Sequence, residues 1–334
     1  MGKMKEIHLV KRPETTPTNE HIQLVDAETP EQSEGEVLVK PLYISVDPYM
    51  RGRMSNTKSY IAPFELNKPL EGGAVAQVVE SSHEDLAQGD IVTGMIPWAE
   101  QAVVPGDSVR KIDPSLGPLS PTLHVLGMPG LTAYFGLTDI GQPKEGETVV
   151  VSGAAGAVGS TVVQIAKIYG CRVVGIAGTE EKIDFLKELG ADATINYKTE
   201  NVKEALKEKC SEGVDVYFDN VGGDISDAVY PLLNKFARII QCGAIASYNK
   251  PGDQGPRMQM HLIKSSALMK GFTVGDYQER FGEGLKRLST WLQEEKLTYK
   301  ETVTEGFENV PDAFFGLFKG ENIGKQLVKV ADPE

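Results

Sequence analysis

The sequence predicts an α/β protein in which a β-rich module precedes a doubly wound, mostly parallel sheet. Up to about residue 125, short apolar or alternating runs are separated by Gly, Pro, Asn and Asp, a pattern typical of strands in a barrel or sandwich. From about residue 147, glycine-bounded apolar strands alternate with stretches of helical spacing. This alternation indicates parallel strands joined by covering helices.

The elements of the first module are short strands, and the last part of the chain adds two more elements. The expected strands are EIHLVKR, IQLVDAE, EVLVKPLYISV, GAVAQVVES, DIVTGM and EQAVVP. A helix around DAFFGLFKG and a strand at KQLVKVAD follow residue 300. With 334 residues and ~150 residues per domain, two domains are expected. We place the first at 1–125, completed by 305–334, and the second at 126–304.

In the second module the strands TVVVSG, RVVGIAG, ATINY, VDVYFDNVGG, ARIIQCGAI and LMKGFTV alternate with helical stretches. EEKIDFLKELG predicts a helix closed by glycine, and YQERFGEGLKRLSTWLQEEKL predicts one long amphipathic helix. Such alternation is characteristic of nucleotide-binding folds, in which ligands lie beyond the carboxyl ends of the strands.

Composition excludes several classes of function. The formal net charge of −13 argues against a nucleic-acid partner, which requires an excess of Lys and Arg. No apolar run approaches the ~18 residues of a membrane helix, and the first residues contain no secretory apolar segment. The three cysteines are widely spaced, as in proteins of reducing compartments. We expect a cytoplasmic protein with neither a nucleic-acid nor a membrane partner.

The glycine-rich stretch GAAGAVGS, after a valine-rich strand and before an amphipathic helix, predicts a dinucleotide site. Ala154, Gly156 and Gly159 occupy the three fingerprint positions, with Ala154 in place of the first glycine. Gly156 lets the backbone approach a pyrophosphate, and Gly159 lets the helix pack closely on the strand. The helix N-terminus offers free N–H groups. The alternative is a tight turn without a ligand, which the strand–helix context disfavours.

The end of the second strand favours NADP over NAD. An NAD site places an acidic residue about 20 residues after the glycines, but here Gly178 and Thr179 occupy that place. Lys182 follows one turn into the next helix, where it can reach a 2′-phosphate, and Thr179 can donate a hydrogen bond. Glu180 and Glu181 are close, and are explained as first-turn residues that favour the helix dipole. The alternative for Lys182 is a solvated surface side chain.

Seven motifs, in order along nearly the whole chain, carry a family resemblance: SVDPYMRG (45–52), GMPGLTAYFGL (127–137), GAAGAVGS (153–160), NYK (196–198), FDNVGG (218–223), CGAIASYN (242–249) and GENIGK (320–325). With them the chain resembles the zinc-independent medium-chain dehydrogenases/reductases, more narrowly the prostaglandin reductase and leukotriene B4 12-hydroxydehydrogenase group. The resemblance implies a GroES-like N-terminal domain, an inserted Rossmann domain, NADPH as cofactor and a homodimer. It also implies reduction of the carbon–carbon double bond of an α,β-unsaturated ketone or aldehyde.

The resemblance assigns roles to individual residues. Lys182 would hold the 2′-phosphate and Tyr197 would pack at the adenosine end. Asn220 would lie near the nicotinamide half, and Asn322 would close on the cofactor. Tyr248 corresponds to the tyrosine placed over the substrate carbonyl, and its alternative is a loop tyrosine on the rim of the site. The remaining cofactor-binding candidates are Met128, Gly156, Ala157, Val158, Gly178, Thr179 and Cys242.

Enone reduction delivers hydride to the β-carbon and gathers negative charge on the carbonyl oxygen, so the protein must stabilise an enolate. A hydroxyl donor suffices, either Tyr248 or the nicotinamide ribose. A metal is not required, and none is expected. Ser45-Val46-Asp47 and Leu70-Glu71-Gly72 stand where the zinc-dependent branch has a cysteine and Gly-His-Glu.

For four further residues, contact with the substrate is one of two possible interpretations. Tyr49 and Arg53 could face the substrate or brace the joint between the domains, and bracing is favoured. Arg257 and Met258, in a loop, could contact the substrate or nothing. Cys242 is expected to be a small residue at a strand end rather than a nucleophile.

Three other functions compete with enone reduction as interpretations of this sequence. A quinone reductase of the same zinc-free branch shares the cofactor fold, and a non-catalytic NADPH-binding sensor shares the cofactor residues. A short-chain dehydrogenase requires Tyr-x-x-x-Lys, and none of the 11 tyrosines has lysine four residues later. The first two rivals remain open, and the third is excluded.

Overall fold

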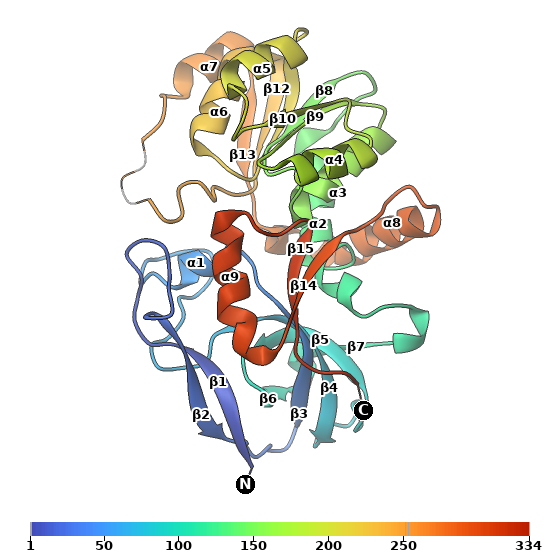
Figure 1. Cartoon of the computed structure of the whole chain (residues 1–334). Helices are drawn as coiled ribbons and strands as arrows, with labels where there is room; N and C mark the ends of the chain where they lie inside the picture. Colours follow the sequence, from blue (N-terminus) through green and yellow to red (C-terminus); the bar gives the residue numbers. More distant parts are fainter. Residues whose placement is uncertain (1, 251, 253, 334) are drawn as a thin grey trace. The chain divides into compact units, whose positions relative to one another are not determined.

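The structure is a computed structural model that describes residues 2–250, 252 and 254–333. The chain divides into two compact units. The N-terminal unit comprises residues 1–123, 301–322 and 326–334, and the parallel-sheet unit comprises 124–300 and 323–325. The α/β class predicted from the sequence is confirmed, with β-rich architecture in the first unit and a parallel sheet in the second (Figure 1).

The N-terminal unit contains two antiparallel sheets. A two-stranded sheet pairs β1 (Lys3–Leu9) with β2 (Ile22–Glu28). The larger sheet has the order β14–β15–β3–β4–β5–β7, and β6 pairs with β3. Its strands are β3 (Glu36–Ser45), β4 (Glu71–Ser81), β5 (Ile91–Pro97), β6 (Ala102–Pro105), β7 (Val109–Ile112), β14 (Glu301–Glu305) and β15 (Lys325–Lys329).

The core of this unit follows from the alternation of apolar residues along its strands. Val37, Val39 and Ile44 of β3 are fully buried in one apolar cluster, together with Trp98. The cluster also receives α9 (Val310–Lys319), in which Phe314 is fully buried against Trp98 at 6.3 Å between ring centroids. The C-terminal return is therefore part of the core of the first unit.

The parallel-sheet unit has six strands in the order β10–β9–β8–β11–β12–β13, and every pairing recorded between them is parallel. The strands are β8 (Thr148–Val151), β9 (Arg172–Ala177), β10 (Ala193–Asn196), β11 (Val214–Asp219), β12 (Leu233–Gln241) and β13 (Leu268–Gly271). The chain moves outward in one direction from β8 to β10 and then returns to pair β11 with β8 on the other side. Ligands of such sheets bind at this reversal, beyond the carboxyl ends of the strands.

Helices cover both faces of the parallel sheet. Val149 and Val151 of β8 join one buried cluster with α2, α3, α4 and α8, whereas Val150 joins another with α5, α6 and α7. Figure 1 shows α3 and α4 together and α5, α6 and α7 grouped apart from them. The helices are α2 (Met128–Phe135), α3 (Ala157–Ile168), α4 (Glu180–Glu188), α5 (Val202–Lys209), α6 (Gly223–Val229), α7 (Gln259–Ser265) and α8 (Phe281–Gln293).

Shorter helical segments complete the two units. In the N-terminal unit they are α1 (Met50–Arg53), η1 (Gly106–Ser108), η2 (Pro114–Leu116), η3 (Ser120–Leu123) and η7 (Phe307–Asn309). In the parallel-sheet unit they are η4 (Gly136–Gly141), η5 (Tyr230–Leu232) and η6 (Val274–Arg280).

One predicted element differs from the structure. The stretch from Tyr277 was expected to form one long α-helix, but residues up to Arg280 form the 3₁₀ segment η6, and α8 begins at Phe281. Thr273 and Asp276 form a reciprocal capping box that starts η6 rather than α8. The apolar spacing continues through both segments, which is why the pattern predicted a single helix.

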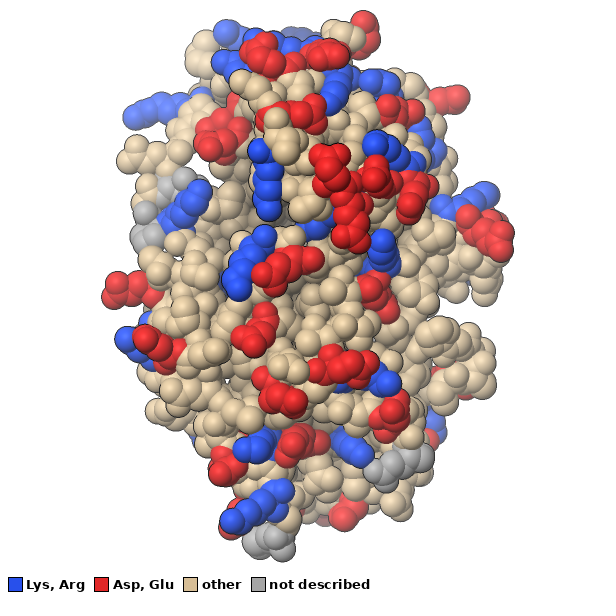
Figure 2. Space-filling view, viewed as in Figure 1, with Lys and Arg blue, Asp and Glu red and all other residues tan. Residues whose placement is uncertain are grey.

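Within the described ranges, no helix has both the length and the apolar character that crossing a membrane would demand. Acidic and basic side chains are intermingled over the face shown in Figure 2, without a large region of one sign.

Candidate cofactor site

The turn between β8 and α3 has the geometry that the glycine pattern predicts. Gly153 has a φ of +57°, a left-handed conformation that favours glycine. A Cβ on Gly159 would lie 2.3 Å from the Gly153 carbonyl oxygen, so α3 packs against the turn too closely for any side chain there. Gly156 caps the start of α3 in an extended conformation. The N–H groups of the first helical turn therefore follow a turn, residues 153–156, whose only side chains are the buried methyl groups of Ala154 and Ala155.

A segment from far along the chain closes this turn. The backbone N–H of Gly324 donates to the Ala155 carbonyl oxygen at 2.7 Å, and Gly324 forms a parallel bridge with Gly156. Gly324 has a φ of +65°, and a Cβ there would lie 1.8 Å from the Lys300 carbonyl oxygen. Asn322, which the family resemblance assigns to the cofactor, lies two residues before Gly324 in the chain and belongs to the N-terminal unit.

Asp219, at the end of β11, joins three strand ends, and the sequence analysis did not single it out. Its fully buried carboxylate accepts hydrogen bonds from Ser152 Oγ (2.9 Å), Ser226 Oγ (2.6 Å) and Gln241 Nε2 (3.1 Å). The Tyr217 hydroxyl and the N–H groups of residues 221 and 222 also donate to it. The carboxyl ends of β8, β11 and β12 are thereby fixed to one another at the sheet edge where a cofactor would bind.

The nicotinamide candidates Asn220 and Cys242 lie around this carboxylate. Asn220 Nδ2 donates to the Ser152 carbonyl oxygen at 2.8 Å, and the Cys242 N–H donates to the Asp219 carbonyl oxygen at 2.9 Å. Burial, together with the negative charge of Asp219, raises the pKa of the Cys242 thiol to about 12. A thiol that stays protonated is a poor nucleophile. The geometry therefore agrees with a packing role for Cys242.

Tyr248 lies in the loop after β12. Its hydroxyl oxygen accepts a hydrogen bond from the backbone N–H of Ala244 at 3.2 Å. Burial raises the pKa of Tyr248 above its ordinary value, so the hydroxyl keeps its proton and remains available as a donor. A Cβ on Gly243 would lie 3.3 Å from the Tyr248 hydroxyl. The Tyr248 hydroxyl therefore lies beside the segment that follows Cys242.

The surroundings of three other candidates, Met128, Arg257 and Met258, do not indicate a particular ligand. Met128 is the first residue of α2 and is 39% exposed. Arg257 is exposed, whereas Met258 is half-buried and packs against the apolar cluster under α5, α6 and α7. Cys242 packs against the cluster on the opposite face of the sheet. The packing of Met258 explains its apolar character without a ligand.

The adenosine-end candidates lie together where β9 and β10 end. Gly178 follows β9, and a Cβ there would lie 2.6 Å from the ring of Tyr197, which follows β10. Thr179 caps α4 by accepting a hydrogen bond from the Lys182 N–H at 3.3 Å. Burial and the nearby charge of Lys198 lower the pKa of Lys182. These residues are therefore neighbours where the two strands end, with the Tyr197 ring against Gly178 and with Lys182 near the charges of Lys198 and Glu181.

In the N-terminal unit, Arg53 is tied into its surroundings. Its Nη2 lies 2.6 Å from Glu71 Oε1, its Nε donates to the Ala62 carbonyl oxygen at 2.9 Å, and the guanidinium lies 4.0 Å from the centroid of the Phe64 ring. The side chain is only 6% exposed. Tyr49 is half-buried, and its pKa is raised by burial and by the charge of Asp47. These contacts all lie within the N-terminal unit, so they hold Arg53 in its own segment and do not test a role between the two units.

The residues present do not fit a zinc ion. Among the described residues, no three His, Cys, Asp or Glu side chains come together as a metal site would require. In the segment where the zinc-dependent branch has its ligands, Ser45 Oγ donates to the Asp47 carboxylate and Glu71 pairs with Arg53. The polar groups at these positions satisfy one another, and no step below involves a metal.

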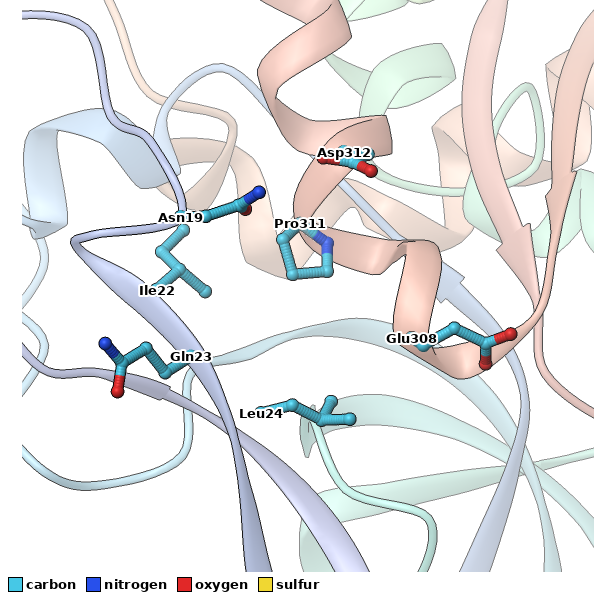
Figure 3. A pocket seen from close by; sticks show the side chains of 7 residues that line it. All are labelled: Asn19, Ile22, Gln23, Leu24, Glu308, Pro311 and Asp312. Atoms are coloured by element: carbon cyan, nitrogen blue, oxygen red, sulfur yellow. The ribbon is translucent and has the colours of Figure 1, made fainter.

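A surface pocket in the N-terminal unit does not suit the cofactor. Figure 3 shows that its walls come from the region of β2 on one side and from η7 and α9 on the other. The lining residues are Asn19, Ile22, Gln23, Leu24, Glu308, Pro311 and Asp312. Glu308 and Asp312 contribute negative charge and no cation faces them in this lining, so the pocket would repel the phosphates of a dinucleotide.

Comparison with known families matches both parts of the chain. Residues 5–112 match the model described as the N-terminal domain of oxidoreductase. Residues 157–290 match the model described as zinc-binding dehydrogenase. The second match covers most of the parallel-sheet unit.

Several characterised or named proteins are similar over almost the whole chain. A Bacillus subtilis protein that carries the name of an NADP-dependent oxidoreductase, YfmJ, is 61% identical, with 98% of each chain covered. The NADPH-dependent curcumin reductase of Escherichia coli is 43% identical, with 99% of each chain covered. Prostaglandin reductase 1 of Bos taurus is 47% identical and covers 94% of this chain and 95% of its own.

The fold is also similar to that of a solved complex. The crystal structure of CurA from Vibrio vulnificus in complex with NADPH has a TM-score of 0.94 and 44% identity, covering 98% of this chain and 100% of that chain. An Escherichia coli quinone oxidoreductase complexed with NADPH, at 21% identity and a TM-score of 0.79, shares the fold alone.

Proposed function

Since the chain belongs to the zinc-independent medium-chain dehydrogenase/reductase family, we propose that it reduces the carbon–carbon double bond of α,β-unsaturated ketones or aldehydes with NADPH. The observation that carries the proposal is the parallel-sheet unit itself. A turn of glycine and alanine residues lies at the carboxyl end of β8, and Lys182, near the charge of Lys198, lies beyond the end of β9. The named substrates of the relatives, curcumin and prostaglandins, support the reaction class.

When bound, NADPH supplies the hydride. The chain would hold its pyrophosphate with the backbone of residues 156–158 and its 2′-phosphate with Lys182, with Gly178, Thr179 and Tyr197 around the adenosine end. Asn220 and Cys242, fixed by the Asp219 network, would face the nicotinamide end, with Met128 and Asn322 completing that side. The fit rests on the glycine turn, since a Cβ at Gly159 would obstruct the packing of α3 on the turn, and Gly153 has a left-handed φ of +57° that favours glycine.

Tyr248 is the proposed catalytic residue. A protonated phenol can donate a hydrogen bond to the substrate carbonyl oxygen, where charge gathers once hydride reaches the β-carbon. Its raised pKa supports a donor rather than a base. The exposed Arg257 is proposed to contact substrate. Arg53 and Met258 are proposed to hold their segments through the contacts described above, and Tyr49 through its packing on the core of the N-terminal unit.

The decisive experiment follows NADPH oxidation by absorbance with a medium-chain alkenone and, in parallel, with a quinone. Turnover of the alkenone to a saturated ketone, identified by mass spectrometry, would support the proposal. Turnover of the quinone alone would favour a quinone reductase of the same branch. Tight binding of NADPH without turnover of either compound would favour a non-catalytic sensor.

We further propose that the protein is a homodimer. The outer edge of β13 pairs with no other described strand, and large apolar side chains are exposed around it. Phe236 is 67% exposed, Ile263 68%, Met260 58% and Leu268 50%. A second copy would cover this surface. Sedimentation of the wild type and of an Ile263→Asp variant tests this, and a monomeric wild type would refute it.

A cytoplasmic location is also proposed, without a nucleic-acid or membrane partner. It is supported by the mixed surface charge in Figure 2 and by the free state of Cys171, Cys210 and Cys242. Fractionation of cells that express a tagged chain would test the location.

A further inference from the structure

Asn196, the last residue of β10, has an arrangement of hydrogen bonds that the resemblance does not account for. Its side chain is 4% exposed. Nδ2 donates to Glu180 Oε1 at 2.6 Å, and Oδ1 accepts from the backbone N–H of Lys198 at 3.1 Å. Its own N–H donates to Glu200 Oε1 at 2.7 Å. One buried amide thus connects the first residue of α4 to the turn after β10.

The carboxylate of Glu180 lies where a negative charge would affect binding of the ribose 2′ group. It begins α4, two residues after Gly178, near the strand end where NAD-selective folds place an acidic side chain for the ribose 2′-hydroxyl. A free carboxylate there would accept a hydrogen bond from that hydroxyl and would repel a 2′-phosphate. The hydrogen bond from Asn196 occupies one of its oxygens and holds the side chain toward β10.

Lys198 is placed by the same residue. In the parallel pairing of β9 and β10, Asn196 lies opposite Ala177, so the residues that follow each strand leave the sheet side by side. The turn that carries Lys198 therefore adjoins the segment that carries Thr179 and leads to Lys182. The charge of Lys198 is close enough to lower the pKa of Lys182. Glu181 is an anion that already acts on Lys182, and a 2′-phosphate, which carries about −1.5 to −2 charges at neutral pH, would be attracted by both lysines.

We propose that Asn196 is the positioning residue for coenzyme choice: it withdraws the Glu180 carboxylate from the ribose and holds Lys198 beside Lys182 as the second cation for the 2′-phosphate. The inference rests on the proposed function, since it assigns a role within the same cofactor site. It adds that selectivity for NADPH depends on a neutral amide that contacts the two charged residues rather than the coenzyme.

The test measures direct binding of NADPH and NADH to the full chain by calorimetry, which does not depend on turnover. Asn196→Ala is expected to lower the ratio of NADPH to NADH affinity by about tenfold, the scale of one charge-assisted contact. Adding Glu180→Gln to that variant is expected to restore most of the ratio. Lys198→Gln is expected to weaken NADPH alone. Lys187→Gln is the matched control, because Lys187 lies further along α4 and pairs with Asp184.

Three results would overturn the proposal: an unchanged ratio in Asn196→Ala, an equal loss of both coenzymes, or no recovery with Glu180→Gln. Thermal unfolding of each variant separates loss of the fold from loss of selectivity. Lys198→Gln tests the pair of lysines by a substitution at an exposed position, so the packing of buried residues is unchanged. If the wild type binds NADPH but the variants keep its selectivity, only this inference fails. If the wild type binds neither coenzyme, the proposed function fails with it.

Discussion

Gly159→Ala tests the central packing contact of the cofactor site. Gly159 is the third residue of α3, and an added Cβ would lie 2.3 Å from the Gly153 carbonyl oxygen and 2.7 Å from the Ala154 Cα. Both contacts are with backbone, so no side chain can rotate away. Ordinary contact begins at 3.4 Å, and the start of α3 must therefore move by about 1 Å relative to the turn.

The magnitude follows from two opposing contributions. Overpacking a tight core costs about 1–3 kcal/mol, and a backbone contact places this variant at the upper end. Replacing glycine by alanine within a helix returns about 1 kcal/mol. The net destabilisation is about 2 kcal/mol, which corresponds to a fall in Tm of roughly 3 °C for a chain of 334 residues. Because the N–H groups of α3 move with the helix, affinity for NADPH should fall by about 100-fold.

The assay combines thermal unfolding followed by circular dichroism with calorimetric titration of NADPH. Gly156→Ala is the first control, because its Cβ would meet the Gly153 oxygen only at 3.3 Å; binding should weaken with little change in Tm. Gly282→Ala is the second, because nothing lies within 4 Å of its Cβ in α8; Tm should rise slightly. A Gly159→Ala protein that melts and binds like the wild type would refute the packing argument.

Three further predictions concern side-chain chemistry. Burial raises the pKa of Cys171 and Cys210 to about 11 and that of Cys242 to about 12, so all three thiols should resist alkylation at pH 8 in the native protein and react after denaturation; fast native alkylation, counted by mass spectrometry, would contradict this. Arg53→Met should lower the free energy of unfolding by about 1 kcal/mol, since it removes the hydrogen bonds to Glu71 and to the Ala62 carbonyl oxygen but leaves Glu71 partly exposed to solvent, and should leave NADPH affinity unchanged; a loss of kcat at unchanged Tm would instead indicate substrate contact. Tyr248→Phe should lower kcat by about 100-fold with nearly unchanged NADPH affinity. Because the pKa of Tyr248 is raised, the wild type should show no loss of kcat from ionisation of this phenol below about pH 10, its ordinary value; a basic limb present in the wild type and absent in Tyr248→Phe would contradict the assignment.

The sequence was most informative where the physical cause is local. The alternation of apolar residues predicted the class of each module, since Val149, Val150 and Val151 are buried on both faces of a parallel sheet. The close approach at Gly159 was predicted from three spaced small residues. In both cases the neighbours that determine the structure lie within a few residues in the chain.

Contacts between distant segments could not be predicted in this way. Asp219 was read only as part of a motif, because its partners Ser152 and Gln241 lie on other strands and become neighbours only through the strand order. Glu180 was explained by the helix dipole alone, since its hydrogen bond to Asn196 depends on the pairing of β9 with β10. The prediction of one long helix from Tyr277 was wrong for a different reason. The capping box at Thr273 starts the 3₁₀ segment η6 without changing the spacing of apolar residues, so the spacing alone did not reveal the boundary with α8.

The hydrogen bond from Gly324 to Ala155 has a consequence for how the protein is made. On the ribosome, the glycine turn and its strand emerge long before residue 324 is added to the chain. Until then the Ala155 carbonyl oxygen cannot accept the hydrogen bond from the Gly324 N–H, and the glycine turn lacks this contact. A chain released early, before the segment 323–325 is synthesised, would carry every residue of the glycine fingerprint and yet lack the segment that bridges to it.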